Sequence, residues 1–155
     1  MSNGRAYLTG LQLLARRELS EAQLRQRLAR RGYGPDEVDV AIGHLLAERA
    51  LDDRRVAAAI AATETRVRGR GRLRVKRQIE AAGIDTSLAE HAVEQVFGEI
   101  DSEALLTAAL DRRLRGRDGI ADDREFQRLY RYLVTQGFES DRVVALLRSR
   151  RRQAR

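Results

Sequence analysis

The chain lacks several residue types, and each absence excludes a class of protein. It has 155 residues, with no cysteine, no tryptophan and a single proline. Without cysteine it can form neither a disulfide framework nor a thiolate active site, and this composition fits a reduced, cytoplasmic compartment. No apolar run approaches the roughly 20 residues that span a bilayer, and the N-terminus has no apolar signal-peptide core. We therefore expect a cytoplasmic protein with no membrane partner.

The sequence also has little β-branched alternation, so a β-sheet is not expected. Instead, apolar residues recur at helical spacing before three glycines, Gly32, Gly83 and Gly137. In each case apolar residues lie eight and four positions before the glycine and directly after it. These residues are Leu24, Leu28 and Tyr33 in the first set, Val75, Ile79 and Ile84 in the second, and Leu129, Leu133 and Phe138 in the third. Such spaced self-similarity is typical of tandem supersecondary units.

Each of these glycines is expected to end a helix in the left-handed conformation, with the next residue packing back on the helix end. A further helix then begins, near Pro35 in the first set and near Ser140, as N-cap, in the third. Another helix precedes each pair. Its link to the next helix is clearest in the first set, where Ser20 and Gln23 predict a capping box. The pattern predicts nine helices in three sets of three.

The expected fold is all-α, with three tandem three-helix, helix-turn-helix-like repeats. The repeats are expected at residues 1–51, 52–99 and 100–155, the last with a basic C-terminal tail. Units of about 50 residues bury too little surface to be robust alone, so we expect them to lean on one another as a short array. No heptad seam is long enough for a coiled coil, and a monomer is expected.

Charge is the second informative feature. The chain has 30 basic and 23 acidic residues, a net charge of +7. Residues 66–77, here called the basic junction, read R-V-R-G-R-G-R-L-R-V-K-R without a carboxylate. An uncompensated run repels itself unless an anion relieves it, and guanidinium groups bind phosphate bidentately. Gly69 and Gly71 allow a partner to approach the backbone closely. The candidate site residues are Arg66, Arg68, Arg70, Arg72, Arg74, Lys76 and Arg77.

Two further basic clusters are present. The C-terminal cluster contains Arg148, Arg150, Arg151, Arg152 and Arg155. It fits either a second anion contact or a helix end that complements its dipole, and both interpretations stay open. The other cluster, Arg25, Arg27, Arg30 and Arg31, is interpreted as a solvated helix face. Few aromatic residues are available for base stacking, so the expected contact is with phosphates, without reading of sequence.

Catalysis finds little support in the sequence. His44 and His91 have no clustered ligands beside them and are interpreted as surface histidines. The acidic pairs Asp52–Asp53 and Asp122–Asp123 could suggest magnesium, but each precedes a predicted helix, where aspartate caps. The R-G-R-G-R segment is not a phosphate loop, because no strand precedes it and no G-K-[ST] follows. We expect no enzyme, no metal and no cofactor.

Three motifs run along most of the chain. They are Leu51-Asp52-Asp53-Arg54-Arg55-Val56-Ala57, then the Arg-Gly-rich junction and Ile79 to Gly83; Leu11-x-x-Leu14-x-x-Arg17-Glu18-x-Ser20-x-x-x-Leu24-x-x-x-Leu28; and Tyr132-Leu133 through Gly137-Phe138. Together they resemble the RecX family of bacterial recombination regulators. The similarity runs from about residue 6 to residue 148, and Val56 and Arg72 depart from the family's usual Phe and Pro.

The resemblance implies a function that composition could not supply. RecX proteins bind the RecA recombinase filament on single-stranded DNA, generally inhibit ATP hydrolysis and strand exchange, and in many cases bind DNA. It thus implies a negative regulator of RecA-mediated recombination and of the SOS response, with its repeats in an elongated, curved arrangement. A sequence-independent DNA-binding module acting without RecA is the alternative, and double-stranded DNA is a further possible partner. A purely protein-binding helical scaffold is a third interpretation.

Overall fold

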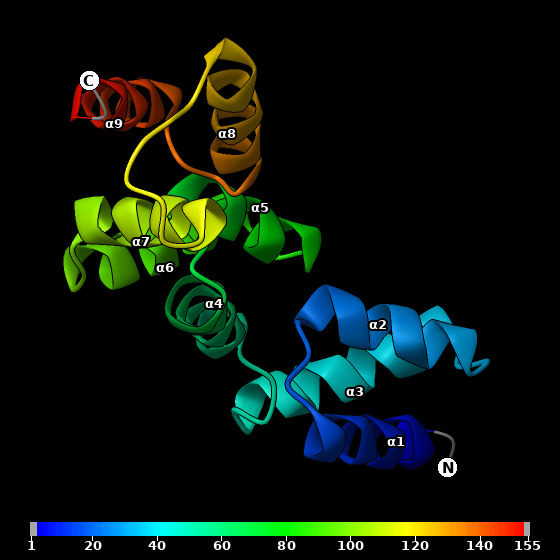
Figure 1. The fold of residues 1–155 in the computed structure, drawn as a ribbon. Helices are drawn as coiled ribbons and strands as arrows, with labels where there is room; N and C mark the ends of the chain where they lie inside the picture. The colour runs from blue at the N-terminus through cyan, green and yellow to red at the C-terminus, as the bar shows by residue number, and fades with distance from the viewer. Residues whose placement is uncertain (1–2, 154–155) are drawn as a thin grey trace. The chain divides into compact units, whose positions relative to one another are not determined.

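The structure, a computed structural model, describes residues 3–153. Within this range the chain forms nine α-helices and no strand, which confirms the all-α class and the expected helix number. No helix in this range is both long and apolar enough to cross a membrane. The helices are α1 (Asn3–Arg16), α2 (Glu21–Arg30), α3 (Pro35–Ala47), α4 (Asp53–Ala62), α5 (Arg72–Ala81), α6 (Thr86–Gly98), α7 (Ser102–Leu114), α8 (Asp123–Thr135) and α9 (Ser140–Gln153), with a π-helical turn, η1 (Thr63–Val67), between α4 and α5 (Figure 1).

The chain divides into two compact units. The first unit contains the residues up to Ile60 together with Gln78–Ala92, and the second contains Ala61–Arg77 together with the residues from Val93 onward. The middle set of helices therefore contributes to both units. The three-repeat boundaries expected from the sequence stay a prediction.

In the first unit α1, α2 and α3 pack on one another (Figure 1). Helix α2 begins at the predicted capping box: the Gln23 N–H donates to Ser20 Oγ at 3.1 Å, and the Ser20 N–H donates to Gln23 Oε1 at 3.0 Å. Leu24 and Leu28 lie one turn apart and are fully buried, as expected from their spacing of four. The core consists of Ala6, Leu13, Leu19, Leu24, Leu28, Val38, Ala41, Ile42, Leu45 and Leu51.

The three glycines end their helices as predicted. Gly32, Gly83 and Gly137 have φ angles of +92°, +80° and +101°, in the left-handed region. After Gly32 the Tyr33 N–H donates to the Leu28 carbonyl, five residues earlier, at 3.3 Å. This is the 6→1 hydrogen bond of a Schellman turn. The residue after Gly137 makes the equivalent bond to the Leu133 carbonyl at 3.2 Å. Each of these turns satisfies carbonyls that the helix leaves open.

The acidic pair before α4 caps two different helices. Asp52 Oδ1 accepts the Arg54 N–H at 3.0 Å, so Asp52 caps α4. Asp53 Oδ1 accepts the Glu21 N–H at 2.8 Å, in the first turn of α2. Burial raises the pKa of the Asp53 carboxyl. Capping, rather than metal binding, accounts for both carboxylates.

The expectation that Ser140 is an N-cap is wrong. Ser140 is the first residue of α9, and the Glu139 carbonyl already accepts the Val143 N–H at 3.0 Å. The turn at Gly137 is tight, and only two residues separate its glycine from the first residue of α9. Because Ser140 already lies inside α9, its hydroxyl does not cap the start of this helix.

The second unit has its own core beneath α7, α8 and α9. Asp122 caps α8 as predicted, accepting the Glu125 N–H at 2.8 Å. The Glu125 carboxylate is buried, with only 6 % of the residue exposed, and accepts bonds from the Arg117 guanidinium and, at 2.7 Å, from the Ala121 N–H. These bonds tie the loop between α7 and α8 to the start of α8. The core consists of Leu106, Ala109, Leu110, Leu114, Ile120, Leu129, Leu133, Phe138, Val143 and Leu147.

Replacing the glycines with alanine separates backbone strain from close packing. At Gly32 a Cβ meets no atom within 4 Å, so Gly32→Ala should cost only the left-handed conformation, about 1–2 kcal/mol. At Gly137 a Cβ would lie 2.4 Å from the Arg74 Cβ, so Gly137→Ala should cost about 2–5 kcal/mol. Urea denaturation measures both free energies of unfolding. Gly98→Ala, where a Cβ meets nothing, is the control, and equal losses at Gly32 and Gly137 would contradict the close contact.

The buried carboxylate of Glu125 should make stability depend on pH. Arg117 and the Ala121 N–H lower the pKa of Glu125 below its ordinary value of 4.5. The stabilisation is therefore present above that value and lost as the pH falls through the lowered pKa. Glu125→Gln should cost about 1–3 kcal/mol at pH 7, and its difference from the parent should shrink at pH 3. Urea melts at both pH values test this, with the exposed Glu94→Gln as control.

Candidate nucleic-acid or filament interface

The basic junction begins on a π-helical turn. After α4 the Arg68 N–H donates to the carbonyl of Thr63, five residues earlier, at 3.1 Å. Turns of this kind are rare and frequently lie at functional sites. Gly69 follows with a φ of +66°, which directs the chain out of the turn, and the Arg70 N–H donates to the Glu64 carbonyl at 2.9 Å. The arginines are thus presented from a defined backbone rather than from a loose linker.

The close approach expected at Gly71 is present, and its partner is the chain itself. A Cβ on Gly71 would lie 2.5 Å from the backbone carbonyl of Gly137. The Gly71 N–H donates to the Gln136 carbonyl at 2.9 Å, and the Leu73 N–H donates to the Gly137 carbonyl at 3.1 Å. The N-terminus of α5 therefore meets the C-terminus of α8, where opposite helix-dipole ends attract. These two amides are not available to a phosphate.

The junction is not uncompensated, which corrects the expectation from its sequence. Arg66 Nη2 lies 2.8 Å from Glu99 Oε2, and Arg68 Nη1 lies 3.0 Å from Glu64 Oε1. Both carboxylates lie outside residues 66–77. Glu64 precedes the run by two positions and could have been considered, whereas Glu99 is brought in by folding.

Glu64 interacts differently with Arg68 and with Arg70. Its Oε2 lies 4.0 Å from Arg70 Nε, and both atoms are buried without a hydrogen bond. The Arg70 side chain is 23 % exposed, and the Arg68 side chain is 58 % exposed. Arg68 can therefore reach an external anion, while Arg70 serves mainly to balance a buried carboxylate.

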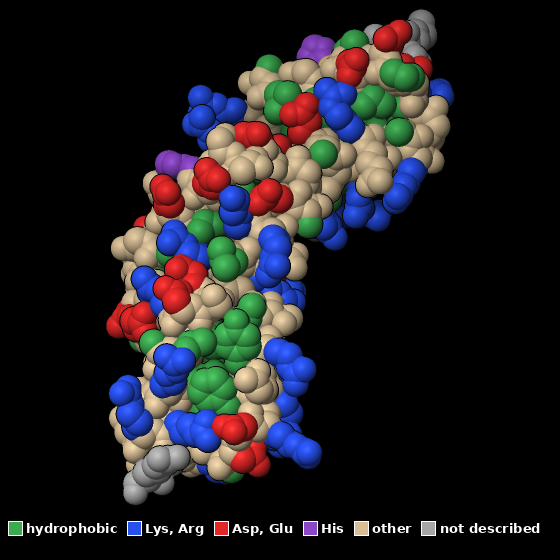
Figure 2. Space-filling view, turned by 90° about the horizontal axis from the view of Figure 1, so that it is seen from above, with side chains coloured by type: hydrophobic (Ala, Val, Ile, Leu, Met, Phe, Trp, Pro, Cys, Tyr) green, Lys and Arg blue, Asp and Glu red, His purple; other side chains and the backbone are tan. Residues whose placement is uncertain are grey.

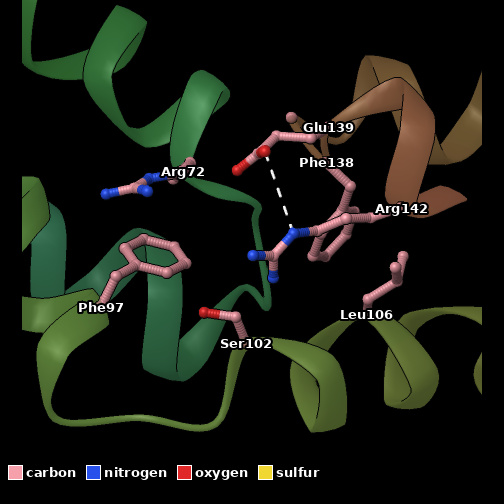
Figure 3. Close-up of a pocket in the computed structure, with 8 residues that line it drawn as sticks. Arg72, Phe97, Ser102, Leu106, Phe138, Glu139 and Arg142 are labelled. Atoms are coloured by element: carbon pink, nitrogen blue, oxygen red, sulfur yellow. Dashed lines mark ion pairs between the residues drawn. The ribbon is translucent and has the colours of Figure 1, made fainter.

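Arg72 lies at the edge of a small hollow in the second unit (Figure 3). Its guanidinium carbon is 5.7 Å from the centre of the Phe97 ring, a cation–π contact. Arg142 lies across the hollow, with its Nε 3.9 Å from Glu139 Oε2. The cavity of about 40 Å³ is much smaller than the roughly 150 Å³ that holds a benzene ring. It cannot take a stacked base. No sequence motif had pointed to Phe97 or Arg142.

The remaining junction residues differ in exposure. Arg74 is half-buried, and its Nη1 donates to the Thr135 carbonyl at 3.4 Å, again at the end of α8. Lys76 is also half-buried. Arg77 is exposed and forms no ion pair or hydrogen bond through its side chain within residues 3–153. Of these three, Arg77 is the one best placed to meet an external phosphate.

The C-terminal arginines lie on α9, in the same unit as the junction. Arg150 pairs with Asp111 at 2.8 Å, and Arg151 pairs with Asp123 at 2.6 Å, so these two tie α9 to its neighbours. Arg148 and Arg152 are exposed and make no side-chain pair in the described part of the chain. Arg155 lies outside the described residues. The ion pairs of Arg150 and Arg151 belong to neither interpretation of this cluster, and an anion contact by Arg148 and Arg152 stays a prediction.

The two histidines do not form a site with other ligands. Both are exposed, and the His44 ring lies edge-on to Tyr7, with 6.2 Å between the ring centres. Within residues 3–153 no three His, Asp or Glu side chains are grouped as metal ligands. Among the described residues, the arrangement offers guanidinium groups to anions.

Known proteins share both the sequence and the fold. Residues 6–45 match the family model of the RecX first three-helix domain. "Regulatory protein RecX" of Halorhodospira halophila is 34% identical over 135 residues, which cover 87% of this chain and 81% of that protein. Its namesake from Syntrophotalea carbinolica is 32% identical, covering 87% and 89%.

Solved structures agree in fold. The crystal structure of RecX from Lactobacillus salivarius has a TM-score of 0.77 at 17% identity, covering 96% of each chain. A second crystal structure, of a regulatory protein RecX, has a TM-score of 0.78 at 22% identity, covering 96% of this chain and 72% of that one. Together with the sequence identity along most of its length, this likeness shows that the chain belongs to the RecX family of non-enzymatic regulatory proteins.

Proposed function

We propose that this chain binds the RecA filament on single-stranded DNA and inhibits its ATP hydrolysis and strand exchange. It would thereby act in the cytoplasm as a negative regulator of homologous recombination and of the SOS response. The observation that carries the proposal is the 34% identity to "Regulatory protein RecX" of Halorhodospira halophila across 87% of the chain. That printed name describes a regulator, and RecA is the recombinase that the family resemblance implies.

The exposed cations of the second unit support contact with a polyanion. Exposed ion pairs are worth only about 0–1 kcal/mol, so a phosphate can compete with Glu99 for Arg66. Arg72 and Arg77 are exposed and make no ion pair in the described part of the chain. Desolvating them therefore breaks no existing salt bridge. The exposed cations of the basic junction and of the C-terminal cluster are Arg66, Arg68, Arg72, Arg77, Arg148 and Arg152.

Inhibition follows if one monomer contacts neighbouring recombinase subunits. A monomer bound along the filament groove, with the basic junction facing DNA or acidic protein, would oppose the subunit motions that ATP turnover needs. Binding that favours one arrangement of the filament shifts the population toward it by the difference in affinity between the two arrangements.

A second candidate is a sequence-independent DNA-binding module that acts without RecA. The observation that favours it is the absence of intramolecular pairs at Arg77, Arg148 and Arg152 within the described residues. A sequence reader is less well supported, because α6 carries Glu90 and Glu94 and no arginine or lysine to offer to base edges.

Steady-state ATP hydrolysis by RecA on single-stranded DNA tests the proposed function. The chain is titrated from far below to equal stoichiometry, and the DNA concentration is varied independently. We expect inhibition at substoichiometric protein that excess DNA does not relieve, because the filament itself is the target. Inhibition abolished by added DNA would favour the second candidate, and no inhibition would refute the proposed function.

The basic junction should contribute to filament binding through its exposed arginines. Arg72→Gln with Arg77→Gln removes two cations without leaving a carboxylate unpaired. Each lost phosphate contact should lower the slope of log affinity against log salt by about 0.7, so affinity at 0.1 M salt should fall roughly 25-fold. Fluorescence anisotropy on RecA filaments measures both. Arg124→Gln with Arg131→Gln, also exposed and in the second unit, is the charge-matched control. Equal losses in the two variants would mean that the junction has no special role.

A further inference from the structure

Helix α2 carries a basic face that is not neutralised. Arg25 is held by Asp39 at 2.5 Å and by Glu21 at 3.2 Å. Arg27, Arg30 and Arg31 form no side-chain ion pair or hydrogen bond within residues 3–153. One arginine of this cluster is thus held in ion pairs and the other three are not, and its interpretation as a solvated helix face stays a prediction.

The unpaired arginines surround a hollow in the first unit. The hollow has a volume of about 370 Å³ and opens to the solvent. Its single apolar lining residue, Leu13, is 6 % exposed and belongs to the core. In Figure 2 some Lys and Arg side chains lie next to Asp or Glu side chains, and others lie together with no acidic side chain beside them. The residues that line the hollow are Leu13, Gln23, Gln26, Arg27, Arg30 and Arg31.

The arginines are not needed to close the end of α2. The turn at Gly32 already supplies backbone donors: the Arg31 N–H donates to the carbonyls of Arg27 and Leu28, and the Gly32 N–H donates to the Ala29 carbonyl. The side chains make no hydrogen bond to these groups. Like charges one helical turn apart repel by a few tenths of a kcal/mol, so three adjacent guanidinium groups form a site that an anion would stabilise.

We propose that this hollow binds the phosphodiester backbone of nucleic acid, as a contact separate from the basic junction. Arg27 and Arg30 are three residues apart, about 4.5 Å along the helix axis. Residues at this spacing lie on the same face of a helix, and both side chains line the hollow. The two guanidinium groups can therefore engage adjacent phosphates. Gln26, which is exposed, adds a neutral donor beside them.

The lining of the hollow distinguishes nucleic acid from other anionic partners. A lipid surface needs exposed apolar anchors beside the cations, and here the only apolar lining residue is buried Leu13. No aromatic side chain lines the hollow, so bases are not stacked and their sequence is not read. This phosphate site extends the proposed function. The choice of DNA as its ligand rests on that proposed function. It gives the first unit a phosphate site of its own.

Binding of the full chain to a fluorescein-labelled thymidine 30-mer, without RecA, tests the proposal. Arg27→Gln with Arg30→Gln should lower the slope of log affinity against log salt by about 1.4 and weaken binding roughly 25-fold at 0.1 M salt. The charge-matched control is Arg5→Gln with Arg54→Gln, in the same unit, exposed and outside the hollow. It should change affinity less than about threefold, since diffuse charge is screened beyond roughly 10 Å. Circular dichroism confirms that each variant is folded.

A second measurement does not depend on any variant. Hydrogen exchange of the parent chain should show slower exchange over residues 23–31 when the 30-mer is added, and no change there when inorganic phosphate replaces it at equal concentration. Equal losses in the two double variants, no protection of residues 23–31, or no binding by the parent would each overturn the proposal. These outcomes differ from a failure of RecA inhibition, because neither experiment contains RecA.

Discussion

The second unit depends on hydrogen bonds that join the end of α8 to the start of α5. The carbonyls of Gln136 and Gly137, at the end of α8, accept the N–H groups of Gly71 and Leu73, at the start of α5. Only glycine at position 71 allows this approach, because a Cβ there would lie 2.5 Å from a backbone carbonyl. The contact satisfies polar groups at both helix ends and holds the start of α5 against the end of α8.

The two basic segments differ in how their charge is balanced. In the junction, Arg66, Arg68 and Arg70 lie beside Glu99 and Glu64. On α2, Arg27 and Arg30 have no such neighbours in the described part of the chain. Local sequence suggests the opposite, because the junction has no carboxylate of its own while α2 begins with Glu21. Folding brings carboxylates close to some arginines and not to others. The arginines without an ion pair therefore need not lie in the segment with the most basic residues.

Much of the fold could be predicted because its signals are local. Helical spacing, the left-handed glycines and the Ser20–Gln23 capping box each depend on residues within a few positions of one another. All of these were confirmed. The candidate site was predictable only as a list of cations, since Arg150 and Arg151 pair with Asp111 and Asp123. Those partners are 39 and 28 positions away, and no local pattern connects them.

The sequence by itself determined the helices, their ends and the family, because backbone propensities, capping and the spacing of apolar residues act over single turns. Only the tertiary structure decided which arginines are free. That outcome depends on which carboxylates packing brings within about 4 Å, and Coulomb attraction is strong only at such distances. It also decided that Gly71 approaches Gly137 rather than an external partner, because the position of one helix end against another is set by the cores beneath them.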